Sequence, residues 1–306
     1  MSPGRPAPVR PAAAPAASSH PVRTRPVRAP GRRRRPHPAG ARLVAVLIAL
    51  AFLVPLLLVV HGSLRGRGLA PATGPELVPA GATLAAYADL FRVLPLDTFL
   101  RNSLLVAAVA VPLTVVVASL AGWGIRLLGR RARVAAVAGV VLVMLVPASS
   151  VWATRFEVLR ALRLDGTVLT LALPALMGTS AFFVLVYVWA YHQVDDDTLA
   201  AAALDGAGHL TAWARIAMPQ GRSATFAVAA LAFAWHWGNF LDPLLYVRSP
   251  GSYTAPLGVR TLQQLAPTDW PLLMAAVAVL ALPPVVVFLV AQRRFLSDDT
   301  LSAEAR

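Results

Sequence analysis

Six apolar stretches, each nearly free of charged side chains, are the feature that most constrains how this chain can fold. They cover residues 43–60, 102–125, 134–153, 168–191, 223–247 and 272–291. Each is close to the length of about 20 residues that crosses a bilayer as a helix. The 306-residue chain is 57% hydrophobic and only 14% charged, a composition that excludes an ordinary soluble domain. We therefore predict an all-α integral membrane protein with six transmembrane helices.

Apart from histidine, the basic residues of the chain are all arginine, and the absence of lysine and cysteine excludes several kinds of chemistry. There are 28 of them, with no lysine and no cysteine. A Walker-type phosphate loop needs a lysine, so this chain cannot hydrolyse ATP by that chemistry. The absence of cysteine excludes disulfides, thiolate metal sites and cysteine nucleophiles. His192, His209 and His236 have no metal-ligand spacing, and we predict no catalytic residue, no metal site and no cofactor in this chain.

The positions of the arginines predict the topology. Ten of them lie in residues 1–42, which we interpret as a disordered Arg/Pro-rich cytoplasmic tail and not as a nucleic-acid-binding segment, because no aromatic residue interleaves them. Four more crowd into residues 126–133. Basic residues favour the cytoplasmic side, so the N-terminus is predicted to be cytoplasmic. Residues 43–296 then form a six-span domain, and residues 297–306 form a short cytoplasmic tail.

A polar island interrupts the apolar pattern at residues 195–219, which this topology places in the cytoplasm. Asp195–Asp197 favour a helix N-terminus, and the alanines that follow propagate the helix. Gly206 can take the left-handed conformation that ends it. A second short helix is expected from about Thr211 and should stop before Pro219, since the residue ahead of a proline is pushed out of the α region. The island therefore predicts a cytoplasmic helix-turn-helix.

The spacing of this island resembles the EAA loop of ABC importer permeases. The matching positions are Ala200, Ala201, Ala202, Gly206, Ile216, Met218 and Pro219, with an intact Asp205-Gly206-Ala207 core. The resemblance implies that these nine residues couple the chain to an ATPase. One position departs from the pattern, because the family's glutamate is Ala200. Docking would then depend on the apolar Leu199, Ala203 and Leu204, with Asp195–Asp197 and Asp205 supplying charge.

Further motifs are similar to the carbohydrate branch of these permeases, in particular to the second permease of maltose-type importers. They are Asn102-Ser103, Met144–Pro147, Arg163–Thr167, Trp237–Phe240, Leu282-Pro283 and Gln292–Phe295, and the resemblance covers residues 43 to 296. A departure follows at Ser297-Asp298-Asp299, where the family commonly has a small glycine-containing tail. The resemblance implies that Trp235, Trp237 and Asn239 lie in a helix that lines the pathway. The alternative for them is interfacial anchoring by the tryptophans and an interhelical hydrogen bond by the asparagine.

The function implied by the resemblance is that of a permease subunit in the bacterial inner membrane, forming half of the pathway for a sugar or sugar-like solute. Its implied partners are a second permease, two ATP-binding cassette subunits that use ATP and Mg and dock on residues 195–219, an extracytoplasmic solute-binding protein and membrane lipid. A self-sufficient secondary transporter or channel is the alternative. Such proteins typically carry ionisable groups within their spans. Here the only charge in a span is Asp242, expected as a solvated charge near the outer surface.

Overall fold

The computed structural model describes residues 39–71, 74 and 76–304. Most of the tail expected for residues 1–42 therefore lies outside the described residues. The chain divides into two compact units, residues 1–49 and 50–306. The described part of the first unit is the beginning of helix α1 (Ala39–Ser63), which is apolar enough to cross a membrane and has no buried residue in its most apolar window.

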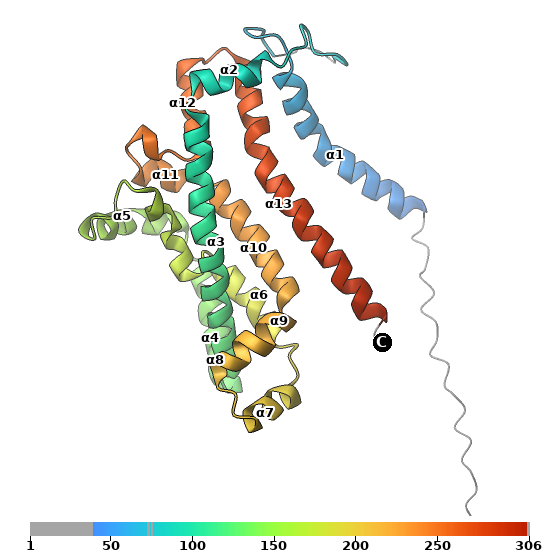
Figure 1. Cartoon of the computed structure of the whole chain (residues 1–306), viewed down its shortest axis with the longest axis vertical. Coiled ribbons are helices and arrows are strands. Elements are labelled where there is room, and N and C mark those ends of the chain that lie inside the picture. The colour runs from blue at the N-terminus through green and yellow to red at the C-terminus, as the bar shows by residue number, and fades with distance from the viewer. Residues whose placement is uncertain (1–38, 72–73, 75, 305–306) are drawn as a thin grey trace, which may run out of the picture. The chain divides into compact units, whose positions relative to one another are not determined.

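The second unit is built from helices around the long α3, and no strand occurs among the described residues (Figure 1). The elements after α1 are α2 (Ala85–Val93), α3 (Leu96–Leu127), α4 (Arg130–Met144), η1 (Ala148–Val151), α5 (Trp152–Ala161), η2 (Val168–Met177), α6 (Ala181–Tyr191), α7 (Asp196–Leu204), α8 (His209–Ala212), η3 (Trp213–Ala217), α9 (Met218–Gln220), α10 (Arg222–Trp237), α11 (Leu241–Tyr246), η4 (Pro250–Ser252), α12 (Ala255–Leu265) and α13 (Trp270–Glu304). The all-α prediction is confirmed. Helix α13 continues through most of the segment expected to be a short tail after residue 296.

Three of the predicted spans are broken rather than continuous. Only α1, α3 and α13 are long and apolar enough on their own to cross a membrane among the described residues. Helix α4 and the η1–α5 pair meet at 86°, and η2 meets α6 at 44°. Counting each bent pair as one span gives up to five. The expected span over 223–247 is also interrupted, because α10 ends at Trp237 and α11 begins only at Leu241. The six-span count therefore stays a prediction.

The breaks have identifiable local causes. Pro147 precedes η1, and a proline pushes the residue before it out of the helical region. Between η2 and α6, Gly178 and Thr179 both have positive φ, 74° and 61°. A glycine adopts this conformation without strain, whereas for a β-branched threonine it is an outlier. The chain thus turns sharply within two of the apolar stretches that were each expected to be one span.

Helix α3 is the centre of the packing, and the core between α3, α6 and α10 lies along its second half. The buried side chains there include Tyr187, Tyr191, Val228 and Ala232. Gly122 lets α6 approach closely, because a Cβ atom at this position would lie 2.6 Å from the Cβ of Tyr187. Close approach over small residues is how membrane helices gain packing contacts.

The first turns of α3 are tied to α12 by polar groups. The side-chain amide of Asn102 donates to the carbonyls of Gly251 and Tyr253 at 2.9 and 3.0 Å. The Ser103 hydroxyl accepts the backbone N–H of Ala255 at 2.8 Å. Both side chains are buried. The Asn102-Ser103 pair singled out in the sequence therefore caps the segment that begins α12, which fixes α12 beside α2 at this end of α3 (Figure 1).

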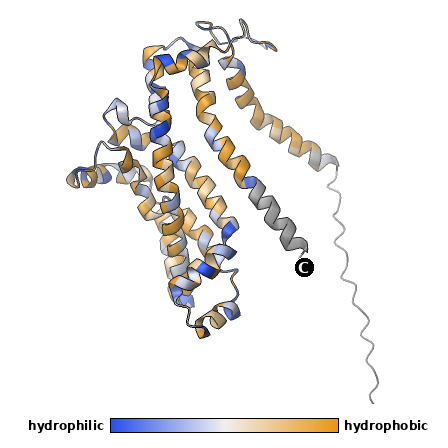
Figure 2. Cartoon of the chain, in the orientation of Figure 1, coloured by the Kyte–Doolittle hydropathy of each residue, from blue (hydrophilic) through white to orange (hydrophobic). Residues whose placement is uncertain are grey.

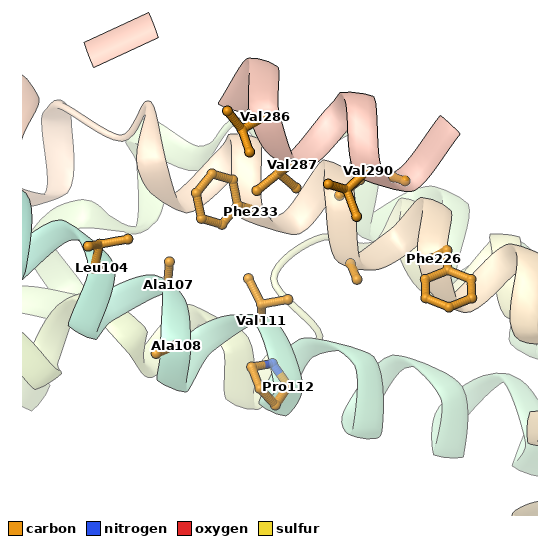
Figure 3. Close-up of a pocket in the computed structure, with 13 residues that line it drawn as sticks. Leu104, Ala107, Ala108, Val111, Pro112, Phe226, Phe233, Val286, Val287 and Val290 are labelled. Atoms are coloured by element: carbon orange, nitrogen blue, oxygen red, sulfur yellow. The ribbon is translucent and has the colours of Figure 1, made fainter. Parts of the chain in front are cut away.

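An apolar groove of about 590 Å³ lies between α3, α10 and α13. Figure 3 shows Leu104 and Val111 of α3 facing Phe233 of α10 and Val286 and Val290 of α13 across it. Its lining contains no polar side chain. Hydropathy is distributed accordingly, with apolar residues along α3, α10 and α13 and hydrophilic residues concentrated towards α2 and the α7–α9 segment (Figure 2). The groove has no group that could orient a polar ligand.

Candidate functional site

The predicted helix-turn-helix forms, and its first helix ends as the sequence indicated. Helix α7 starts after Asp195, and Gly206 has φ +81°. The N–H of Ala207 donates to the carbonyl of Ala202 at 2.9 Å, and the N–H of Gly206 to that of Ala203 at 3.0 Å. This pair of bonds is the Schellman arrangement, in which a glycine in the left-handed conformation closes the helix. No residue contacts a Cβ built at Gly206, so backbone conformation alone requires glycine there.

The prediction that the second helix stops before Pro219 is wrong. Helical backbone runs from His209 through Pro219 to Gln220, with a π turn at Trp213–Ala217. Within that turn the N–H of Met218 bonds to the carbonyl of Trp213, five residues back. The wider π turn shifts the hydrogen-bond register ahead of the proline, which has no N–H to contribute. A single π turn therefore carries the helix past Pro219.

The residues of the loop motif divide into an exposed set and a packed set. On α7 and its cap, Ala200, Ala201 and Asp205 are exposed, and Leu204 is 90% exposed. The remaining motif residues of this half, Ala202 and Ala207, are partly exposed, as are Ile216 and Met218, whereas Pro219 is exposed. Ile216 and Met218 pack on the core between α3 and α6. The first half of the motif, on α7, therefore forms an exposed surface. Most of the second half packs on the core between α3 and α6, and the helical segment His209–Gln220 is called the anchor below.

Three further contacts hold the anchor. The indole N–H of Trp123 at the end of α3 donates to the carbonyl of His209 at 3.1 Å. The Tyr191 hydroxyl of α6 lies 3.1 Å from Met218 Sδ. Ala217 is fully buried between them. The helix that follows α7 is consequently joined to two membrane helices.

The first turn of α7 is held by charge. The Arg126 guanidinium forms an ion pair with Asp196 and donates to the carbonyl of Tyr191 at 3.2 Å. The hydrogen bond from Arg126 and its positive charge lower the pKa of Asp196 below its usual value. Beside it, Arg133 Nη1 lies 3.2 Å from His192 Nε2. Partial burial of the imidazole and then the charges of Arg133 and Arg126 lower the pKa of His192, which favours its neutral form.

A second candidate site is a smaller, polar cavity of about 220 Å³. It is lined by Ala148, Trp152, Arg155, Pro174, Thr179, Trp235, Asn239, Leu241 and Asp242. These residues come from three parts of the chain, namely η1–α5, the η2–α6 junction and the α10–α11 junction. Its polar groups are provided by the very segments in which the predicted spans are broken.

Asp242 is not the solvated surface charge that the sequence suggested. It is only 8% exposed. Its carboxylate accepts from the Asn239 amide at 2.8 Å and lies 3.4 Å from Arg155 Nη1. A buried carboxylate needs such partners, since burial without them is costly. The break before α11 brings Asn239 and Asp242 onto one turn, where both line the cavity.

The three residues predicted to line a pathway fall in two places. Asn239 lines the polar cavity. Trp237 is 3% exposed, and its indole N–H donates to the carbonyl of Leu280 at 2.9 Å, so it lies in the packing of α10 against α13. Trp235, the other tryptophan of α10, lines the cavity and is 55% exposed. Sequence reasoning missed Trp152, Arg155 and Thr179.

The described residues contain no cluster of three or more His, Cys, Asp or Glu side chains able to hold a metal ion. His192 follows the end of α6 and His209 begins α8, while His236 is buried and bonds through Nε2 to the Thr179 hydroxyl at 3.0 Å. Nothing in these residues gives the histidines a shared site.

Comparison with known proteins gives a consistent picture. No family model matches the sequence. The sulfoquinovosyl glycerol transport system permease protein SmoH of Agrobacterium fabrum is 26% identical, with 84% of this chain and 90% of that protein covered. The inner membrane ABC transporter permease protein YcjP of Escherichia coli is 25% identical, with 83% and 91% covered.

Solved structures agree on the fold. A bacterial ABC transporter involved in the import of the acidic polysaccharide alginate matches with a TM-score of 0.67, 18% identity and coverage of 84% of this chain and 95% of that chain. A bacterial alginate ABC transporter in complex with an alginate pentasaccharide-bound periplasmic protein matches with a TM-score of 0.58, 13% identity and coverage of 82% and 92%. The relatives of this chain are permease subunits of ABC transporters, and its fold is that of an ABC importer permease.

Proposed function

We propose that this chain forms half of the translocation pathway of an ATP-driven importer for a sugar or sugar-like solute, and that α7 is the surface on which an ATPase subunit docks. One observation carries the proposal: the exposed helix α7 is followed by the helical segment His209–Gln220, which packs on α3 and α6. Leu204 is 90% and Leu210 70% exposed on either side of Gly206. Outside a membrane, such apolar side chains gain most when a partner covers them.

The partners follow from what the chain lacks and from its relatives. With no lysine in the sequence, ATP and Mg would be used by two separate ATP-binding cassette subunits. A second permease would complete the pathway, and an extracytoplasmic solute-binding protein would deliver the solute, as the alginate structure with its periplasmic protein suggests for this class. The chain itself is a transport component and not an enzyme. The permease relatives favour this function over a self-sufficient secondary transporter.

The sidedness follows from charge. Arg126, one of the four arginines within 126–133, pairs with Asp196 of α7, and basic residues mark the cytoplasmic side. The N-terminus and the 195–219 loop would then both be cytoplasmic, in a bacterial inner membrane. The end of α3 that carries α2 and α12 would face outward, toward the solute-binding protein.

Two glycines of the loop give a matched test of docking. Gly206 and Gly208 both have open space around a Cβ atom, but Gly206 has φ +81° whereas Gly208 has φ −71°. Gly206→Val is expected to strain the turn by about 1–2 kcal/mol and to reorient α7. Gly208→Val fits its extended backbone without strain. ATP-dependent solute uptake should be lost in Gly206→Val and retained in Gly208→Val, with equal membrane insertion of the two proteins.

Docking itself can be read by crosslinking, because the chain has no native cysteine. Leu204→Cys should crosslink to an ATPase subunit, and Asp205→Arg should weaken that crosslink. Ala200→Glu, which places the family's residue on an exposed helix, should leave uptake intact or raise it. Normal uptake in both Gly206→Val and Asp205→Arg would show that the loop is not the coupling site.

A further inference from the structure

The polar cavity is formed where three chain breaks meet. Trp152 and Arg155 follow the 86° bend after α4, Thr179 lies at the bend between η2 and α6, and Asn239 and Asp242 follow the end of α10. The Tyr246 hydroxyl of α11 bonds to the carbonyl of Trp152 at 3.3 Å, which holds two of the breaks together. Figure 1 shows α5 and α11 on the same side of α3. Irregular backbone in a membrane protein is tolerated where it lines a cavity.

The cavity reaches toward the middle of the bundle from an exposed rim, where Ala148, Trp235 and Leu241 lie. Thr179 contacts the hydroxyl of Thr114, which is near the middle of α3, and its hydroxyl also lies 3.0 Å from His236 Nε2. Thr179 keeps its strained φ of 61° in this position. Strain of this kind persists where surrounding structure imposes it, often at binding sites. Ionisable groups at such a depth face the protein interior or a water-filled path, because facing lipid is too costly.

The side chains that line the cavity include one positive and one negative charge, so their charges balance. Arg155 and Asp242 are the only charged residues around the cavity. Asn239 donates to Asp242 at 2.8 Å, whereas the Arg155 guanidinium stays 3.4 Å or more from the carboxylate. The guanidinium therefore keeps donors for another group, and the carboxylate keeps acceptor capacity. Two tryptophans, Trp152 and Trp235, add aromatic surface.

From this arrangement we propose that the cavity is a solute subsite on this chain that binds one neutral sugar ring or a polyol of similar size. Asp242 accepts and Arg155 donates hydrogen bonds to hydroxyl groups, and Trp235 covers an apolar face of the ring. A neutral solute fits because neither charge of the lining would be left without a counter-charge. The volume of about 220 Å³ is below the roughly 300–1,000 Å³ of pockets for drug-sized ligands, which limits the occupant to about one ring. The inference rests on the proposed function and names the solute class for it.

Site-specific labelling tests the subsite in the assembled importer. Ala148→Cys lines the cavity, and the neighbouring Ser149→Cys is exposed outside it, in a chain with no other cysteine. The importer with its companion subunits is placed in nanodiscs and treated with a polar maleimide, and labelling is read on this chain alone. At about ten times its dissociation constant, methyl glucoside should slow labelling of Ala148→Cys about tenfold. Labelling of Ser149→Cys should not change, and glucuronate should protect Ala148→Cys far less than methyl glucoside.

Two charge-neutralising variants then test the role of charge. Asp242→Asn keeps an acceptor for Asn239 but leaves Arg155 unbalanced, so glucuronate should become the better protectant by on the order of tenfold. Arg155→Gln leaves Asp242 unbalanced and should shift the preference to glucosamine. Protection of Ala148→Cys by none of the three sugars, or a preference for glucuronate with both native charges present, would overturn the proposal. A reversal of preference in Asp242→Asn would support it.

The subsite and the proposed function fail separately. ATP-dependent uptake in proteoliposomes reports on the importer function, whereas protection of Ala148→Cys in nanodiscs without ATP reports on the subsite. Active uptake without protection would reject the subsite alone. Protection without ATP-dependent uptake would reject the importer function and leave the subsite in place.

Discussion

The two halves of the 195–219 loop are neighbours in sequence but are held in different ways. Helix α7 has no buried residue, and its ends are fixed by the Asp196–Arg126 pair and by the Schellman turn at Gly206. The α8–α9 half has Ala212 and Ala217 buried and is bonded to α3 and α6.

This difference indicates that α7 and the α8–α9 half of the loop have different roles. A helix held at its ends and by the packing of Leu199 alone keeps most of its surface available to a partner. A helix embedded in the core of α3 and α6 moves with those helices, because packed interiors transmit displacement rather than absorb it. The loop would therefore receive force on α7 and deliver it through the anchored half. If equivalent substitutions in the two halves change stability equally, this distinction between the halves is wrong.

The largest expected effect comes from overpacking the anchored half. Ala217→Leu adds volume where the side chain is fully buried, and overpacking typically costs about 1–3 kcal/mol. We expect a clearly lower midpoint for loss of monodisperse protein on heating, measured by size-exclusion chromatography in detergent.

Ala201→Leu is the matched control, since Ala201 is exposed on α7 and leucine is a good helix former. Its thermal midpoint should equal that of the native chain, while ATPase association changes. Equal destabilisation by the two leucines would remove the distinction between the halves.

A smaller effect is expected from the bond that joins α8 to α3. Trp123→Phe removes the indole N–H that donates to His209 and should weaken the anchor by about 1 kcal/mol. A spin label on Leu210→Cys, a position 70% exposed, should gain mobility in this variant. Trp189→Phe on the exposed face of α6 should leave the label unchanged. If Trp123→Phe also leaves the label unchanged, this contact does not anchor α8.

The first half of the loop could be predicted from sequence because its structure is local. A glycine after a run of alanines and acids before it are signals within one helix, and they predicted both the position of α7 and the positive φ of Gly206. The prediction that the second helix ends before Pro219 was wrong, because a proline ends a helix only while the helix keeps its α-helical hydrogen-bond register. The π turn that carries the helix past it is stabilised by the packing of Trp213, Ile216 and Met218 on distant helices.

The polar cavity could not be predicted for a similar reason. Apolar composition predicts that a segment enters the membrane, but it does not show where that segment bends. Asp242 looked like a surface charge because the sequence does not reveal that Arg155, 87 positions earlier, lies beside it. Asn239 and Trp235 were predicted through the family resemblance, whereas Trp152 and Thr179 became evident only once the bends after α4 and before α6 were placed.

The smallest expected effect concerns the charge that holds the first turn of α7. The hydrogen bond from Arg126 lowers the pKa of Asp196, so the paired carboxylate stabilises the folded arrangement above the usual aspartate pKa, and this contribution is lost as pH falls through the lowered value. The Asp196 side chain is 83% exposed, which makes the contribution small. A spin label on Ala201→Cys should keep its mobility from neutral pH down to about pH 4, the ordinary aspartate pKa, and should gain mobility only below it. In Asp196→Asn the spin label should be mobile at every pH.

Asp197→Asn is the matched control, because the native Asp197 carboxylate forms no ion pair within the described residues. Its label mobility should change with pH as in the native chain. A native label signal independent of pH would mean that the Schellman turn and the packing of Leu199 hold α7 without help from this charge, and the α7 half would then depend on the core more than the comparison allows.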